Sequence, residues 1–110
     1  MKLFHSTSIV AVQAIERHGF IESDFAGIAS GVWLSSRPLD GADGASCSAE
    51  ACFEVSVPAG FDISEFEVIE EGRPADAYRE WLIPASVVNG WPRRRVVDYT
   101  PSSLRPPWAY

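Results

Sequence analysis

The sequence predicts an α+β fold with one helix near the N-terminus and a mostly antiparallel sheet. One amphipathic segment, at about residues 9–18, is followed by five or six short apolar stretches. These stretches lie too close together for crossover helices, which parallel neighbours need. The 110 residues are enough to bury one core and too few for two. We therefore expect a single domain over residues 1–110.

The N-terminal segment combines a strand signal with a helix signal. A first strand is expected over residues 2–5, and the hydroxyl residues at 6–8 can then cap a helix. The helix is expected to run from Ile9 to His18 and to end at Gly19. Its apolar residues recur at helical spacing and predict one buried face, made of Ile9, Val12 and Ile15 with Ala11.

The rest of the chain alternates between turn-rich segments and short strands. Residues 21–30 are predicted to be a loop, and residues 38–48 are rich in Gly, Ala, Asp and Ser, as in a connection. Residues 51–57 alternate in polarity, which predicts a half-buried strand with Phe53, Val55 and Val57 on its apolar side. The other expected elements are strands at 31–36, 66–69, 81–83 and 95–97, a turn at 70–76, a short helix from Pro84 through Val88 that Gly90 closes, and an irregular tail at 100–110.

Charge and hydropathy exclude several classes of function. The net charge of −6 and the pI of about 4.7 argue against broad nucleic-acid affinity. The basic run Arg93-Arg94-Arg95 is better explained by an edge strand whose charges discourage sheet pairing than by a phosphate contact. No apolar run suits a bilayer span, and no basic-then-apolar leader is seen, so a cytoplasmic protein without membrane contact is expected.

Cysteine and histidine usage predicts no metal. Cys47 and Cys52 have no His or further Cys at zinc spacing, and His5 and His18 are the only histidines. Reduced thiols are the default in this setting, with a local Cys47–Cys52 disulfide as the alternative. Neither a phosphate-binding loop followed by Lys-Ser/Thr nor a Gly-x-Ser-x-Gly nucleophile turn is present.

One spaced triplet could carry chemistry: His5, Trp33 and Glu80, each in a short strand-like segment. Such a set could grip a nicotinamide nucleotide and strain its glycosidic bond. Breaking that bond leaves positive charge on the ribose, so a nearby carboxylate stabilises the transition state more than the ground state. A flat aromatic ring can hold the departing base by stacking.

These segments carry a family resemblance over about residues 2–98. The order Leu3-Phe4-His5-Ser6-Thr7, Gly31-Val32-Trp33-Leu34-Ser35 and Tyr78-Arg79-Glu80-Trp81-Leu82-Ile83-Pro84 resembles the His-Tyr-Glu branch of the ADP-ribosyltransferase superfamily. That branch includes poly-ADP-ribose polymerases, diphtheria-type toxins and RNA 2′-phosphotransferases. The resemblance implies a small split antiparallel β-sheet core with an N-terminal helix, and NAD as substrate.

The resemblance also implies a role for each matching residue. His5 would hold the adenosine-side ribose hydroxyl and Glu80 would be the catalytic glutamate. Ser6 and Thr7 would lie beside the nicotinamide amide, Trp33 would stack on nicotinamide in place of the usual tyrosine, and Ser35 would fill the small position two residues later. Tyr78 stands where arginine-modifying members carry Glu or Gln. Arginine as acceptor is therefore not supported.

The expected function is transfer of ADP-ribose from NAD to an unknown protein or nucleic-acid acceptor, or to water as an NAD glycohydrolase. The alternative is a catalytically inert interaction module on the same scaffold. The residues also admit plainer interpretations: His5 bonded to a backbone carbonyl, Trp33 in the core, and Glu80 on the surface paired with Arg79 or another arginine. Trp81 is predicted to be core. Whether the protein is a toxin, a regulator or a counter-defence factor depends on its partners.

Overall fold

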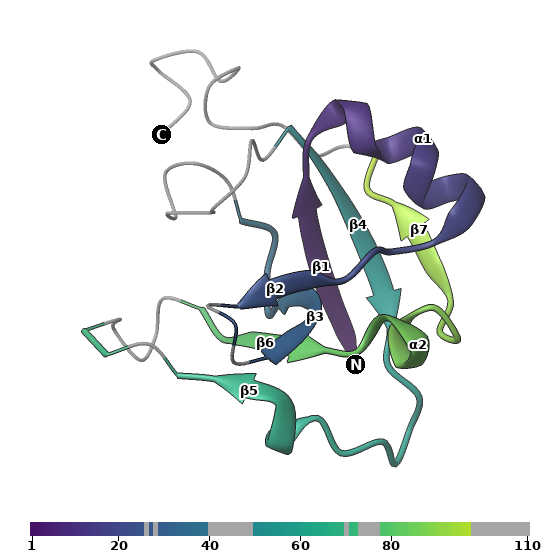
Figure 1. The fold of residues 1–110 in the computed structure, drawn as a ribbon. Coiled ribbons are helices and arrows are strands. Elements are labelled where there is room, and N and C mark those ends of the chain that lie inside the picture. Colours follow the sequence, from purple (N-terminus) through teal and green to yellow (C-terminus); the bar gives the residue numbers. More distant parts are fainter. Residues whose placement is uncertain (26, 28, 40–49, 70, 73–77, 98–110) are drawn as a thin grey trace, which may run out of the picture.

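The computed structural model describes residues 1–25, 27, 29–39, 50–69, 71–72 and 78–97. These residues form a compact α+β domain with a seven-stranded antiparallel sheet and two short helices, α1 near the N-terminus and α2 near the end of the described chain (Figure 1). The strands are β1 (Lys2–Thr7), β2 (Ser23–Phe25), β3 (Ala29–Ser35), β4 (Ala51–Ser56), β5 (Glu67–Val68), β6 (Glu80–Ile83) and β7 (Arg93–Arg95); the helices are α1 (Ile9–His18), α2 (Ala85–Val88) and the 3-10 turn η2 (Ser64–Phe66). The predicted class and the antiparallel pairing are confirmed.

The sheet has the order β5–β6–β3–β1–β4–β7, with β2 added beside β3. β1 pairs with β4 along its whole length, from Lys2 opposite Ser56 to Thr7 opposite Ala51. On its other side β1 meets β3 at one residue pair only, Phe4 opposite Ser35. The sheet is thus joined continuously on one side of β1 and at a single point on the other.

Helix α1 runs from Ile9 to His18, as predicted, and ends at Gly19. Gly19 has φ 85°, a left-handed conformation that favours glycine, and its N–H donates to the Ile15 carbonyl at 2.9 Å. Val12 and Ile15 are buried as expected. Ile9 is not: it is 50% exposed, because the helix begins at the surface, where the Ile9 N–H donates to the exposed Glu50 carboxylate.

The predicted cap at residues 6–8 is only partly right. Ser6 and Thr7 belong to β1, because they pair with Cys52 and Ala51 of β4. Ser8 is the residue before the helix, and its side chain makes no capping hydrogen bond. The strand is therefore longer than predicted, which matters for the position of the cavity described below.

The core lies on the face of the sheet that α1 covers. Phe53, Val55 and Val57 are buried there as predicted, and so is Trp81 at 1% exposure. Cys52 is also fully buried, although its strand was predicted to be half-exposed on that side. Burial raises the pKa of the Cys52 thiol to about 12, with the nearby Glu54 charge adding to the effect, so this free thiol stays protonated.

Several predicted boundaries are wrong. The predicted loop at 21–30 contains β2 and the start of β3, because Ser23–Phe25 pairs with Ala29–Gly31. The predicted strand at 66–69 is shorter in the structure: Phe66 is the last residue of the η2 turn, and only Glu67 and Val68 form the strand β5. The last strand is Arg93–Arg95 rather than 95–97, and it is the edge strand expected of the basic run. Cys47, the tail at 100–110 and most of the segments at 38–48 and 70–76 lie outside the described residues.

Both helices are short. α1 has ten residues and α2 has four, with Pro84 before α2 as predicted and Asn89 at its C-terminal cap. Among the described helices, none is long and apolar enough to cross a bilayer. The position of α2, beside the segment that follows α1, becomes important for the site (Figure 1).

Candidate functional site

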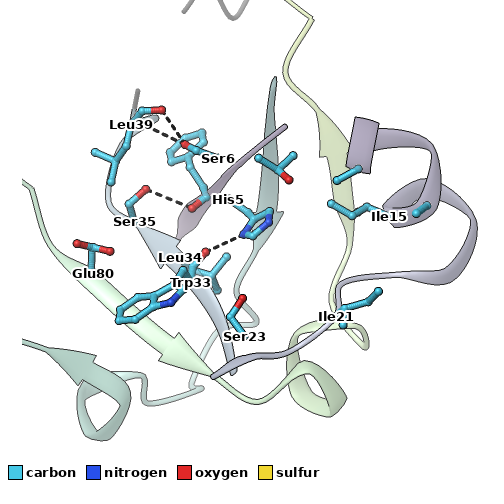
Figure 2. A pocket seen from close by; sticks show the side chains of 14 residues that line it. His5, Ser6, Ile15, Ile21, Ser23, Trp33, Leu34, Ser35, Leu39 and Glu80 are labelled. Carbon is cyan, nitrogen blue, oxygen red and sulfur yellow. Dashed lines mark hydrogen bonds between the residues drawn. The ribbon is translucent and has the colours of Figure 1, made fainter. Parts of the chain in front are cut away.

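A cavity of about 280 Å³ lies at the division between β1 and β3. All six residues that the sequence predicts for the site line it: His5, Ser6, Thr7, Trp33, Ser35 and Glu80. The other lining residues among those described are Phe4, Ala11, Ala14, Ile15, Ile21, Ser23, Leu34 and Leu39. Figure 2 shows these side chains gathered from β1, α1, β2, β3 and β6, with Ile21 and Leu39 from the connecting segments.

The cavity opens where β1 and β3 stop pairing. From Phe4 opposite Ser35, a continuing antiparallel ladder would bring Ser6 opposite Trp33. The described strands form no such pair. Instead, the Nδ1 atom of His5 lies 2.9 Å from the carbonyl oxygen of Trp33 (Figure 2). The His5 imidazole is thus hydrogen-bonded to the Trp33 carbonyl, which would bond to β1 if the ladder continued.

This hydrogen bond determines the protonation of the His5 ring. A carbonyl oxygen can only accept, so Nδ1 carries the proton and Nε2 of the neutral ring is left as an acceptor. Burial lowers the pKa of His5, and the bond to Trp33 opposes that effect only in part. His5 is therefore neutral near pH 7, and its Nε2 is a hydrogen-bond acceptor. His5 is thus bonded to a backbone carbonyl, as the plainer interpretation states, and it also lines the cavity.

Ser6 contributes its two parts differently. Its hydroxyl donates to the Leu39 carbonyl at 2.8 Å and accepts from the Leu39 N–H at 3.2 Å, so it secures the chain that follows β3. The Val57 N–H donates to the Met1 carbonyl, so the odd-numbered residues of β1 direct their backbone N–H and C=O groups toward β4. Because these groups alternate in direction along a strand, the backbone N–H and C=O of Ser6 are directed toward β3. The backbone of Ser6, rather than its hydroxyl, is thus the part turned toward the cavity.

Thr7 and Ser35 are buried polar residues of the cavity wall, 7% and 3% exposed. The Thr7 carbonyl accepts from the Glu50 N–H at 2.9 Å, which anchors the end of β1. The Ser35 hydroxyl lies 2.7 Å from the Arg37 carbonyl and 3.2 Å from the Phe4 carbonyl. With one proton to donate, it serves mainly the closer acceptor and keeps the end of β3 against β1.

Glu80 and Trp33 lie on the same side of β3. Glu80 is the first residue of β6 and pairs with Ser35, and Trp33 is two residues from Ser35, so the side chains of all three share one sheet face. Figure 2 shows the Glu80 carboxylate beside the Trp33 indole, with His5 further toward α1. Trp33 and Glu80 are both half-buried. Among the described lining residues Glu80 is the one carboxylate.

Arg79, which the alternative interpretation of Glu80 names, forms an ion pair with Glu67. Its guanidinium donates two hydrogen bonds to Glu67, at 3.0 and 2.7 Å, and lies 5.1 Å from the centroid of the Trp81 ring. Alternation along the strand puts Arg79 and Trp81 on the face opposite Glu80. The ion pair lowers the pKa of Glu67, mainly through these hydrogen bonds.

Sequence reasoning missed the apolar wall of the cavity. Ala11, Ala14 and Ile15 come from α1, and Ile21, which is 77% exposed, lies at the rim. The helical spacing predicted that Ala11 and Ile15 belong to a packing face, but it did not predict that they line a cavity. Part of that face lines the cavity only because β1 and β3 separate there.

Comparison with protein-family models, with curated proteins and with solved structures found no match. Among the described residues, no group of three His, Cys, Asp or Glu side chains is placed to hold a metal ion. We therefore infer a function from the geometry and chemistry of the cavity, together with the resemblance that the sequence carries.

Proposed function

We propose that this protein is a small enzyme of the ADP-ribosyltransferase type that cleaves nicotinamide from NAD and passes ADP-ribose to an acceptor or to water. The observation that carries the proposal is that His5, Trp33 and Glu80, from three different strands, all line one cavity. The imidazole belongs to the sheet face that α1 covers, and the indole and the carboxylate belong to the other face. The single-pair contact between β1 and β3 adds support, because a split antiparallel sheet is what the family resemblance implies.

Glu80 supplies the electrostatic part of the reaction. The bond between the ribose C1′ and the nicotinamide nitrogen breaks, and its electron pair leaves with nicotinamide. The ribose becomes cationic, and the Glu80 carboxylate opposes that charge. An acceptor hydroxyl or water then bonds to C1′ and loses its proton. The largely apolar lining makes the surroundings of the carboxylate less polar than water, which strengthens its effect.

The other residues bind and orient the substrate. The Trp33 indole stacks on nicotinamide, whose amide lies beside the Ser6 backbone. His5 accepts a ribose hydroxyl proton at Nε2, which its bond to Trp33 leaves unprotonated. The cavity volume is near the lower end of the range for small-molecule sites, about 300–1,000 Å³. It suits nicotinamide and its ribose, and the remainder of the dinucleotide extends out of it.

Release of nicotinamide is the decisive measurement. The purified protein is incubated with NAD, with and without candidate protein and nucleic-acid acceptors, and nicotinamide is quantified by chromatography. We expect release that depends on the protein. Absence of release under every condition would contradict the proposed reaction.

Tryptophan fluorescence tests binding separately from chemistry. We expect NAD to quench the emission of the protein and expect Trp33→Ala to remove that component, with the other tryptophans as background. Quenching that persists unchanged in Trp33→Ala would refute the stacking role. Binding without nicotinamide release would point to the inert interaction module on this scaffold.

A further inference from the structure

Phe20, in the segment between α1 and β2, packs against His5 and does not itself line the cavity. Phe20 is 4% exposed, and its ring meets the His5 imidazole edge-on with centroids 5.0 Å apart. On its other side it meets Phe53 at 5.9 Å, also edge-on. The imidazole therefore rests against a ring that is itself packed on the core, and its orientation depends on where Phe20 is held.

Phe20 is held by Asn89, at the C-terminal cap of α2. The Oδ1 atom of Asn89 accepts the Phe20 N–H at 2.8 Å, and its Nδ2 donates to the Phe20 carbonyl at 3.0 Å. One side-chain amide thus satisfies both backbone groups of Phe20, and the two bonds together assign its oxygen and nitrogen. Asn89 is not among the residues that line the cavity.

Gly19 leaves the space that this contact needs. A Cβ at Gly19 would lie 2.6 Å from Oδ1 of Asn89, closer than real Cβ contacts come. The left-handed backbone of Gly19 also disfavours any other residue. The end of α1 is therefore shaped so that the amide of Asn89 can reach Phe20.

Arg93 of β7 also contacts Phe20 and the end of α1. Its guanidinium donates to the Ile15 carbonyl at 3.1 Å and lies 5.8 Å from the centroid of the Phe20 ring. Next along the chain, the Glu22 carboxylate accepts the Ala85 N–H at 3.1 Å, a second tie to α2. Phe20 is thus fixed by α1, α2 and β7 at once.

We propose that Asn89 is a positioning residue for the cavity: by holding Phe20 against the imidazole, it fixes the orientation in which His5 donates to Trp33 and presents Nε2 to a ligand. The part of this inference that concerns NAD rests on the proposed function. The part that concerns the His5 ring does not, and it can be measured without substrate.

The experiment is NMR of the histidine ring nitrogens in the parent and in two variants. Asn89→Ala removes both bonds to Phe20. Asn89→Asp keeps an acceptor for the Phe20 N–H, but it replaces the donor to the Phe20 carbonyl with a charged oxygen that repels that carbonyl. Because this charge by itself raises the pKa of a nearby His, the tautomer is the readout for Asn89→Asp, which serves if the alanine variant does not fold. We expect the pKa of His5 to rise toward its ordinary value, because a loosened Phe20 admits water, and the single Nδ1–H tautomer to become mixed.

Asp62→Ala is the matched control. It removes the hydrogen bond that the Ser64 N–H donates to Oδ1 of Asp62 at 2.9 Å, between residues that do not line the cavity. We expect the pKa and the tautomer of His5 to be unchanged in this variant. Shifts of His5 in the Asn89 variants alone support the proposal whether or not NAD is consumed.

The kinetic arm separates positioning from catalysis. With NAD, the Asn89 variants are expected to raise KM about threefold or more and to leave kcat nearly unchanged, because the reacting carboxylate is not moved. A folded Asn89 variant whose His5 pKa and tautomer match the parent overturns the proposal. If the parent itself does not consume NAD, the proposed function fails while the NMR result still decides the role of Asn89.

Discussion

The two sides of β1 differ in how they are closed, and that difference separates stability from function in this domain. Toward β4, six consecutive residue pairs form a continuous ladder, with Leu3 opposite Val55 in the core. Toward β3, one pair forms and an imidazole then occupies the next acceptor. The same strand thus supplies packed structure on one side and a cavity on the other, since backbone groups not used in a ladder must find other partners.

The largest expected effect tests the closed side of β1, which is the side paired with β4. Leu3→Ala truncates a side chain that is 1% exposed, so it should lower the free energy of unfolding by about 2–5 kcal/mol. Denaturant titration measures the loss. Leu39→Ala, which borders the cavity, is the matched comparison and should cost less because its surroundings are already partly open. Equal losses would show that the two sides are equally packed.

The next effect tests the open side of β1, which is the side that faces β3 and the cavity. Glu80→Gln keeps the size of the side chain and deletes its charge, so turnover of NAD should fall by roughly 10² or more with NAD affinity nearly intact. Thermal stability should stay close to that of the parent, since Glu80 is half-buried at the cavity and not in the core. A Gln variant that releases nicotinamide at the parental rate would refute the catalytic role.

A smaller effect is expected at His5. In the proposed reaction His5→Ala removes an acceptor for a ribose hydroxyl and no reacting group, so KM for NAD should rise more than kcat falls. Steady-state kinetics over a range of NAD concentrations measures the two separately. An unchanged KM would argue against contact between His5 and substrate. Below the lowered pKa of His5, protonation of Nε2 should have a similar effect on KM in the parent.

The smallest effect concerns the surface of the closed side. Glu54 accepts from Arg94 at 3.0 Å and lies 3.3 Å from Lys2, and the hydrogen bond from Arg94 is the main reason that its pKa is lowered. A lowered folded-state pKa stabilises the protein above the unfolded-state pKa, and this contribution is lost as the pH falls through the folded value. Glu54→Gln should therefore slightly weaken the acid dependence of unfolding, most visibly at low salt. Identical acid titrations of the variant and the parent would contradict this role.

Local sequence patterns determined the class of the fold and much of its core. Helical spacing identified Val12 and Ile15, alternation identified the buried side of β4, and Gly19 marked the helix end. These signals are short-range, because each reflects the period of one element against one apolar layer. They failed where pairing over distance decides the structure, as at β2, whose three residues are a strand only because Ala29–Gly31 lies beside them.

The candidate site divides in the same way. The sequence by itself indicated which residues could act on a nicotinamide nucleotide, because His5, Trp33 and Glu80 have suitable chemistry in strand-like segments. Only the tertiary structure decided that they share a cavity, that the Ser6 hydroxyl serves Leu39 and that Asn89 holds the ring behind His5. Those facts depend on where β1 and β3 separate. That separation is set by contacts between residues far apart in the chain, which no local pattern encodes.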